Sequence, residues 1–194
     1  MSTATPHDHG PTPDAGVRTA RPVDASAIGA VHAAAWVADY AALLPRRAAS
    51  VDAASLSSSW QQAIEAPPSR QHRVMVATAG PEVVGFVAFG PSSDADAAAP
   101  GVDEPDAEIV TLLVLPAARR TGHGSRLLNA TVDTLRENGF GLVRTWVPEP
   151  DQQRVDFLRA AGFAPDGAAR VLDAGDGAST VRELRLSARI DDQR

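Results

Sequence analysis

Residues 111–128, with the sequence TLLVLPAARRTGHGSRLL, pass from an apolar run through a short basic loop into a helical pattern. Pro116 ends the apolar run, and because proline cannot donate to a sheet ladder, a strand is expected to finish at or just before it. Gly122 and Gly124 have no Cβ, so their main-chain N–H groups can come close to a ligand. Apolar residues at i, i+4 and i+7 then predict an amphipathic helix. A strand, a glycine loop and a helix N-terminus in this order predict an anion site.

Hydrophobic periodicity along the rest of the chain predicts an α/β domain with a mixed sheet. Asp24 and Asp151 are expected to cap helices, and Pro45 is expected to end the first helical region. Two β–helix–β stretches late in the chain favour a sheet with parallel as well as antiparallel strands. Residues 1–16 are rich in Pro, Asp and small residues and are expected to form a disordered leader before one domain at 17–190. The expected strands are 17–20, 74–78, 83–89, 109–115, 142–147, 169–172 and 181–188, and the expected helices lie at 24–45, 51–64, 124–138 and 151–162.

Composition excludes several classes of function. The chain has 194 residues, which is enough for one domain and too few for two ordinary ones. Its net charge of −6 argues against nucleic-acid binding, which requires a basic face. The absence of cysteine excludes disulfides, thiolate catalysis and cysteine-based zinc sites, and no metal site is expected. No apolar run approaches the roughly 20 residues of a membrane span. No signal-peptide pattern opens the chain either, so a cytoplasmic location is expected.

The glycine loop differs from the two commonest nucleotide-binding motifs. No Gly-Lys-Ser/Thr sequence ends it, as a Walker loop requires, and it lacks the third glycine of a dinucleotide-binding motif. Residues 119–124 (RRTGHG) instead match R-x-x-G-x-G, between a strand that ends in proline and a helix that begins S-x-L-L. This pattern resembles the acetyl-CoA loop of the GNAT N-acetyltransferase superfamily.

Further segments resemble the same superfamily in the same order, from about Val17 to Arg189. They are VRTARPVDASAIGAVHAAAWVADYAALLP at the first strand and two helices, VVGFVAFGP and AEIVTLLVLP at the third and fourth strands, and WVPEPDQQRVDFLRAAGF at the last motif. The resemblance implies the GNAT fold, a mixed, mostly antiparallel central sheet with splayed fourth and fifth strands, flanked by helices. It also implies that acetyl-CoA is the cosubstrate, with its thioester in the gap between strands 109–115 and 142–147.

The resemblance assigns the cofactor contacts residue by residue. Main-chain amides of the loop would hold the diphosphate, and the two arginines add positive charge there. Strand main-chain groups would bind the pantetheine arm as an added strand pairs with a sheet edge, and an N–H near Leu113 would polarise the thioester carbonyl. The side chain of His123 is expected to point toward solvent or the helix. The expected cofactor-binding residues are Leu113, Val114, Leu115, Arg119, Arg120, Thr121, Gly122, His123, Gly124 and Ser125.

Two residues are expected to act on the acceptor side. Glu108 matches a position where many members carry a glutamate that acts through water as general base, and a solvated rim residue is the alternative. Tyr40 lies four residues after Trp36, near the family's substrate groove, and a core Trp with a Tyr at its edge is the alternative. Glu183 and Arg185 would either reach the same groove or face solvent.

One position departs from the family pattern. Leu158 stands where members usually carry a tyrosine, commonly assigned as the acid that protonates the departing thiolate, and Asp151 replaces an Asn. Tyr40 is the only tyrosine in the chain, so no second one can substitute. Either water or a different side chain protonates the thiolate, or activity is low.

Residues 91–107 form a low-complexity acidic loop. One interpretation is a solvated linker between strands. The other is a negative rim that attracts a cationic amine to the substrate groove. Its acidic residues are Asp94, Asp96, Asp103, Glu104 and Asp106.

The resulting hypothesis is transfer of the acetyl group of acetyl-CoA to a primary amine, by direct attack in a ternary complex. The alternative is a CoA-binding module with weak or no catalysis, acting as a sensor or partner protein. A third hypothesis is a structural protein in which Gly122 and Gly124 only form a turn. The acceptor would be a small-molecule or peptide amine that the sequence does not identify. No nucleic acid or membrane partner is expected, and because members often dimerise, a homodimer is one expected state.

Overall fold

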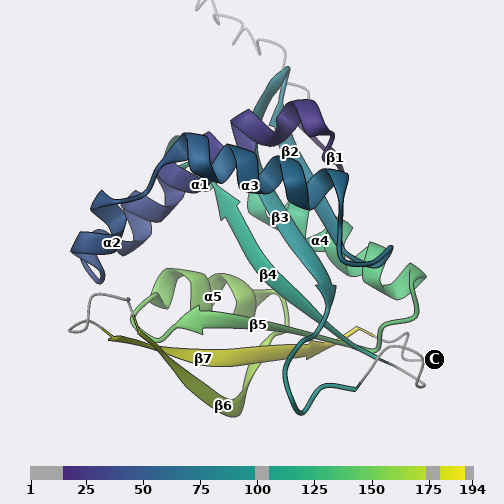
Figure 1. The fold of residues 1–194 in the computed structure, drawn as a ribbon. Helices are drawn as coiled ribbons and strands as arrows, with labels where there is room; N and C mark the ends of the chain where they lie inside the picture. Colours follow the sequence, from purple (N-terminus) through teal and green to yellow (C-terminus); the bar gives the residue numbers. More distant parts are fainter. Residues whose placement is uncertain (1–14, 99–104, 174–179, 191–194) are drawn as a thin grey trace, which may run out of the picture.

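Seven strands form one open sheet in the order β1-β2-β3-β4-β5-β7-β6 (Figure 1). In the computed structural model, which describes residues 15–98, 105–173 and 180–190, every neighbouring pair is antiparallel except β4 and β5. The mixed, mostly antiparallel sheet predicted from the sequence is therefore confirmed. The strands are β1 (Ala15–Thr19), β2 (Arg73–Ala79), β3 (Glu82–Pro91), β4 (Asp106–Val114), β5 (Leu142–Pro148), β6 (Ala164–Asp173) and β7 (Thr180–Arg189).

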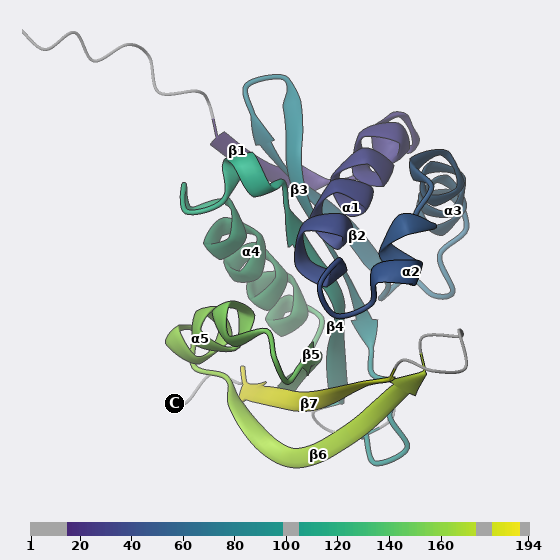
Figure 2. The ribbon, with the colours of Figure 1, turned by 90° about the vertical axis from the view of Figure 1, so that its left-hand side faces the viewer.

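Helices cover both faces of the sheet. Helices α4 and α5 lie on one side, and α1, α2 and α3 lie on the other (Figure 2). Residues 1–14 of the expected leader lie outside the described residues, whereas Ala15 and Gly16 belong to β1. The helices are α1 (Ala25–Tyr40), α2 (Pro45–Ala49), α3 (Ala53–Glu65), α4 (His123–Glu137) and α5 (Gln152–Ala160), with short 3-10 turns η1 (Pro22–Asp24) and η2 (Pro116–Ala118).

The two predicted helix caps have different outcomes. Asp24 precedes α1, but its carboxylate accepts hydrogen bonds from Arg18 at 2.6 and 2.8 Å and from the N–H of Arg21 at 2.7 Å. The prediction that Asp24 caps α1 is therefore wrong, because a cationic partner on β1 takes the carboxylate. Asp151 does cap α5, since it accepts a hydrogen bond from the N–H of Arg154 at 3.0 Å.

Three predicted boundaries are also wrong. Helix α1 ends at Tyr40, and Pro45 begins α2 rather than ending the first helix, because proline suits the first position of a helix. Strand β4 begins at Asp106, earlier than expected, since the start of the strand is polar. Strand β6 begins at Ala164, and its first turn-rich residues bulge where the register with β7 shifts, up to Ala169.

The splay of β4 and β5 predicted from the resemblance is confirmed. The two strands pair only over Asp106–Glu108 and Leu142–Arg144. Just beyond this pairing, the Thr145 hydroxyl donates to the Ile109 carbonyl at 2.9 Å, and the strands then diverge (Figure 1). The separation leaves one edge of β4 without a strand partner.

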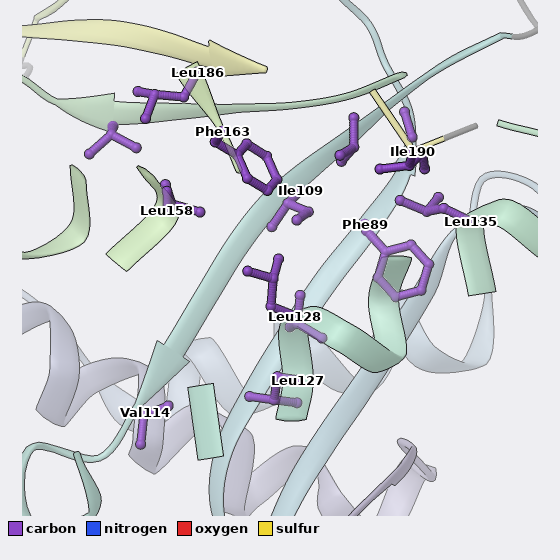
Figure 3. Packing of buried hydrophobic residues seen from close by; sticks show 14 of the residues in the cluster. Phe89, Ile109, Val114, Leu127, Leu128, Leu135, Leu158, Phe163, Leu186 and Ile190 are labelled. Atoms are coloured by element: carbon purple, nitrogen blue, oxygen red, sulfur yellow. The ribbon is translucent and has the colours of Figure 1, made fainter. Parts of the chain in front are cut away.

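Apolar side chains are buried on both faces of the sheet, which explains why the central strands have almost continuous apolar runs. The larger cluster lies between the sheet and helices α4 and α5 and includes Phe89, Leu127, Leu135, Leu158 and Phe163 (Figure 3). The smaller cluster lies under α1 and α3 and includes Ile28, Val31, Val76, Phe86 and Leu113. The gap between β4 and β5 therefore lies in a sheet that is packed on both faces.

Gly29 allows α1 and α3 to approach closely. A Cβ added at this position would lie 2.7 Å from the Ser57 nitrogen and 2.8 Å from the Ala53 carbonyl oxygen, both backbone atoms of α3. We expect Gly29→Ala to destabilise the fold by about 2 kcal/mol, because overpacking outweighs the better helix propensity of alanine. Thermal unfolding measures this. Gly16→Ala is the control, since its nearest contact would be 3.5 Å, and equal stability of both variants would contradict the prediction.

Candidate active site

A cleft of about 630 Å³ occupies the gap between the splayed strands. One wall is β4 from Ile109 to Val114 with the glycine loop, and the other is formed by Thr145 and Trp146 of β5 and the first turns of α5. Asp39 of α1 also lines it. The volume falls in the range of small-molecule sites.

The register of β4 decides which main-chain groups face this cleft. The N–H of Leu115 donates to the Val84 carbonyl of β3 at 2.8 Å, and Leu113 lies opposite Phe86. Because hydrogen-bonded positions alternate along an antiparallel pair, Leu113 and Leu115 direct their N–H and C=O groups toward β3. Val114 faces the cleft instead, together with Leu112, which sequence reasoning missed. The alternation of residue types along β4 does not show which main-chain groups face the cleft, because the strand is apolar on both faces.

A bulge in β4 lies at the point where the strands separate. Thr111 is opposite Ala88 and Ile109 is opposite Phe89, so Val110 is an extra residue without a partner on β3. Bulges of this kind bend a strand and increase its twist. The bulge therefore contributes to the opening of the gap.

The glycine loop forms a compact turn with two left-handed residues. Arg120 and Gly122 have positive φ angles of 65° and 86°, and successive N–H groups in such a turn converge on one point. The Thr121 hydroxyl donates to the Ala118 carbonyl at 2.7 Å, and Arg126 donates to the Thr121 carbonyl at 3.2 Å. Within the described residues, the N–H groups of residues 120–125 form no hydrogen bond to the protein. These amides are free for an anion at the N-terminus of α4.

The two loop arginines have different positions. Arg120 lines the cleft and forms no ion pair within residues 15–98, 105–173 and 180–190. Arg119 turns away from the loop, pairing with Asp39 at 2.8 Å and donating through Nε to the Val114 carbonyl at 3.2 Å. Arg126, which the sequence analysis missed, lies beside the loop on the first turn of α4. The cations beside the loop amides are therefore Arg120 and Arg126.

His123 is buried, which the sequence did not predict. It is the first residue of α4, its side chain is 6% exposed, and neither it nor Thr121 lines the cleft. Burial, with the nearby Arg126, lowers the pKa of His123, so the ring is neutral at pH 7. The expectation that this side chain points toward solvent or the helix is corrected to a buried position.

Glu108 is half-buried on β4, at the last residue that pairs with β5. Burial raises the pKa of its carboxyl, and the nearby Asp94 raises it further, while Arg170 and a hydrogen bond from the Ser93 N–H oppose the shift. A carboxylate with a raised pKa takes a proton more readily. Glu108 lies next to the cleft wall and does not itself line the cleft.

The acidic loop is held against the sheet by ion pairs. Arg185 pairs with Asp94 at 3.0 Å and with Asp96 at 2.6 Å, and Arg144 pairs with Asp96 at 2.9 Å and with Asp106 at 2.6 Å. These contacts lower the pKa of Asp96 strongly. The described acids are therefore paired with cations, and they do not form an unpaired negative rim. Asp103 and Glu104 lie outside the described residues.

A family model for the acetyltransferase (GNAT) family matches residues 37–163. The chain belongs to the GNAT acetyltransferase family.

Solved structures with the same fold confirm the architecture. The yncA protein from Salmonella typhimurium, solved with acetyl-CoA, superposes with a TM-score of 0.67 at 18% identity, over 92% of this chain and 95% of its own. The PaiA N-acetyltransferase from Thermoplasma acidophilum, solved with coenzyme A, gives 0.64 at 16% identity, over 91% and 99%. The ribosomal-protein-alanine N-acetyltransferase from Brucella melitensis gives 0.68 at 18%, over 90% and 99%. No curated protein matches the chain in sequence.

In this GNAT domain the family's tyrosine position is apolar. Leu158 is 5% exposed, lines the cleft and packs in the larger core cluster near Phe163 and Ile109 (Figure 3). A hydrocarbon side chain can neither donate nor accept a proton. Within the described residues, the cleft walls hold no tyrosine.

Trp36 and Tyr40 belong to α1, which lies on the opposite side of the sheet from α4 and α5 (Figure 2). Trp36 and Tyr40 stack with centroids 4.2 Å apart and an interplanar angle of 18°. Burial raises the pKa of Tyr40, so its hydroxyl stays protonated at neutral pH. Neither ring lines the cofactor cleft. Glu183 is buried in an ion pair with Arg170 at 2.7 Å.

Proposed function

We propose that this protein transfers the acetyl group of acetyl-CoA to a primary amine by direct attack in a ternary complex. The observation that best supports it is the set of free N–H groups at residues 120–125, which lies at the mouth of the cleft between β4 and β5. The converging amides suit a diphosphate, and the unpaired edge of β4 suits the amide-containing pantetheine arm.

The cofactor would be held mainly by the main chain. The loop amides, with Arg120 and Arg126, would bind the diphosphate. Val114 would pair with the pantetheine arm through its cleft-facing groups. The N–H of Leu112 also faces the cleft, next to the bulge, and would stabilise the oxyanion that develops on the thioester carbonyl.

Glu108 would serve as the general base, acting through water. A lysine-like amine has a pKa near 10.4 and must lose a proton before it attacks. Glu108 takes this first proton through water. The amine nitrogen then forms a bond to the acetyl carbon, the carbon–sulfur bond breaks, and the second proton of the nitrogen passes to water. The thiolate takes its proton from water, because Leu158 cannot supply one. Tyr40, beside this region on α1, would contact the acceptor.

A CoA-binding module with weak or no catalysis is the second candidate. The observation that favours it is Leu158, whose buried hydrocarbon side chain replaces an acid at the cleft wall. A CoA thiol, however, has a pKa in the thiol range of about 8.5, so water is an adequate proton source. Positioning of the two substrates also supplies much of the rate.

Thiol release from acetyl-CoA across a panel of amines tests the proposal. The panel includes polyamines, aminoglycosides, amino acids, and peptides with free N-termini or lysines. Release stimulated by an amine, with the acetylated amine as product, is the expected result. Calorimetric binding of CoA without stimulated release would favour the second candidate. If CoA does not bind at all, both candidates fail.

The partners and the cellular location of the protein stay predictions. None of the helices in the described ranges combines the length and hydropathy of a transmembrane segment. A cytoplasmic location, the lack of nucleic-acid binding and a homodimeric state are proposals that rest on composition and on the superfamily. Fractionation, and light scattering on the purified protein, would test the location and the oligomeric state.

A further inference from the structure

One carboxylate connects α1 to both walls of the cofactor cleft. Asp39 pairs with Arg119, whose Nη1 lies 2.8 Å from one carboxylate oxygen and whose Nη2 donates a hydrogen bond to the other at 3.0 Å, and it accepts a hydrogen bond from Arg154 at 3.1 Å. Arg119 follows β4 and Arg154 lies on α5, so the two arginines belong to opposite walls. All three side chains line the cleft.

Each arginine is also fixed to its own wall. The Nε of Arg119 donates to the Val114 carbonyl at 3.2 Å, a group that faces the cleft. The Nε of Arg154 lies 3.1 Å from Asp151, which caps α5. The Asp39 side chain is 13% exposed, so this network is largely shielded from solvent. A bidentate arginine–carboxylate pair that is shielded from solvent fixes the relative position of its two side chains better than a solvated surface pair does.

We propose that Asp39 is a positioning residue, which sets the width of the cleft at the level of the pantetheine arm. The inference rests on the proposed function, because it concerns how CoA is held. It also assigns Arg119 to the cleft wall and not to the diphosphate. Tyr40 follows Asp39 on α1. The same helix therefore carries the residue that would position the cleft walls and the residue that would contact the acceptor.

The diphosphate site does not depend on this network. The loop is braced locally, by the bonds from Thr121 to Ala118 and from Arg126 to Thr121. Loss of Asp39 would leave that brace intact and would loosen only the wall spacing. CoA, which carries the pantetheine arm, should therefore respond to the loss, whereas ADP, which carries a diphosphate without that arm, should not.

Charge and geometry predict opposite effects of losing Asp39 on CoA affinity. Asp39→Asn removes one negative charge beside two arginines, which by charge alone would strengthen binding of both anions. Selective weakening of CoA would consequently report on geometry. We expect CoA to bind about tenfold more weakly, in the range of coupling effects from residues outside the ligand contacts, with ADP unchanged or tighter.

The test is calorimetry of Asp39→Asn with CoA and, by displacement, with ADP. Asp133→Asn is the matched control, because Asp133 forms an exposed helical ion pair with Arg136 away from the cleft. Arg119→Gln and Arg154→Gln should weaken CoA more than ADP, because each also removes a positive charge that attracts both anions. This difference between the two ligands tests the proposal if Asp39→Asn does not fold. Unchanged CoA affinity, or equal losses for CoA and ADP, would overturn the proposal. Failure of the unmodified protein to bind CoA would instead overturn the proposed function.

Discussion

Gly124→Asp is expected to weaken CoA binding about a hundredfold while leaving the fold intact, since a buried anion that loses its donors and meets a like charge costs several kcal/mol. A Cβ at Gly124 would meet Phe157 no closer than 3.5 Å, an ordinary contact, so the protein itself tolerates a side chain there. The new carboxylate would lie at the second position of α4. It would accept hydrogen bonds from the N–H groups that the diphosphate needs.

The thermal stability of Gly124→Asp should stay the same or increase, although its CoA affinity falls. An acidic residue in the first turn of a helix interacts favourably with the helix dipole, by about 0.3–1 kcal/mol at exposed sites. A variant that unfolds at the same or a higher temperature but no longer binds CoA would separate the ligand effect from the folding effect. Thermal unfolding and calorimetry on the same sample give both quantities.

Gly124→Asn is the matched control, because it has the shape of the Asp variant without its charge. It should retain most of the CoA affinity, and Gly124→Ala should retain nearly all. Equal losses for the Asp and Asn variants would mean that bulk and not charge matters at this position. Full affinity in the Asp variant would place the diphosphate elsewhere and would favour a purely structural role for the loop.

The features that the sequence predicted correctly are those set by local chemistry. Pro116 ends β4 because proline lacks an N–H, and Asp151 caps α5 because its carboxylate reaches an amide of the next turn. The helices follow from their apolar period, and the parallel contact of β4 and β5 follows from the β–helix–β order. For the strand end, the cap and the helices, the information lies within a few residues of the feature, whereas the parallel contact follows from the order of whole elements.

The features that it missed depend on residues far apart in the chain. Arg119 was expected at the diphosphate, but its partner Asp39 lies 80 residues earlier. Arg144 and Arg185 neutralise an acidic loop from strands on the other side of the sheet gap. Such pairs form only after the strand register is set. The same holds for Leu112, because an apolar strand gives no indication of which edge its amides face.

Glu108→Gln should lower kcat/KM for the best amine of the panel by about a hundredfold near neutral pH, the usual scale for loss of a general base. Because burial raises the pKa of Glu108, the rising limb of the wild-type pH–rate profile should lie above the range of an ordinary glutamate. The variant should lack this limb while binding CoA normally. Glu82→Gln, at the exposed first residue of β3, is the control. A variant that keeps the limb would show that another group titrates.

The same raised pKa predicts how stability responds to the substitution. A group whose pKa is higher in the folded state stabilises the fold below its unfolded pKa, and this contribution is lost as pH rises through the folded pKa. Ionised Glu108 therefore opposes folding at neutral pH, and Glu108→Gln should unfold at the same or a higher temperature there. The difference should vanish below the ordinary glutamate range, where the wild-type side chain is protonated in both states. A variant that lost both activity and thermal stability would point to a structural role for Glu108, whereas lost activity with retained stability is what a base held in an unfavourable environment requires.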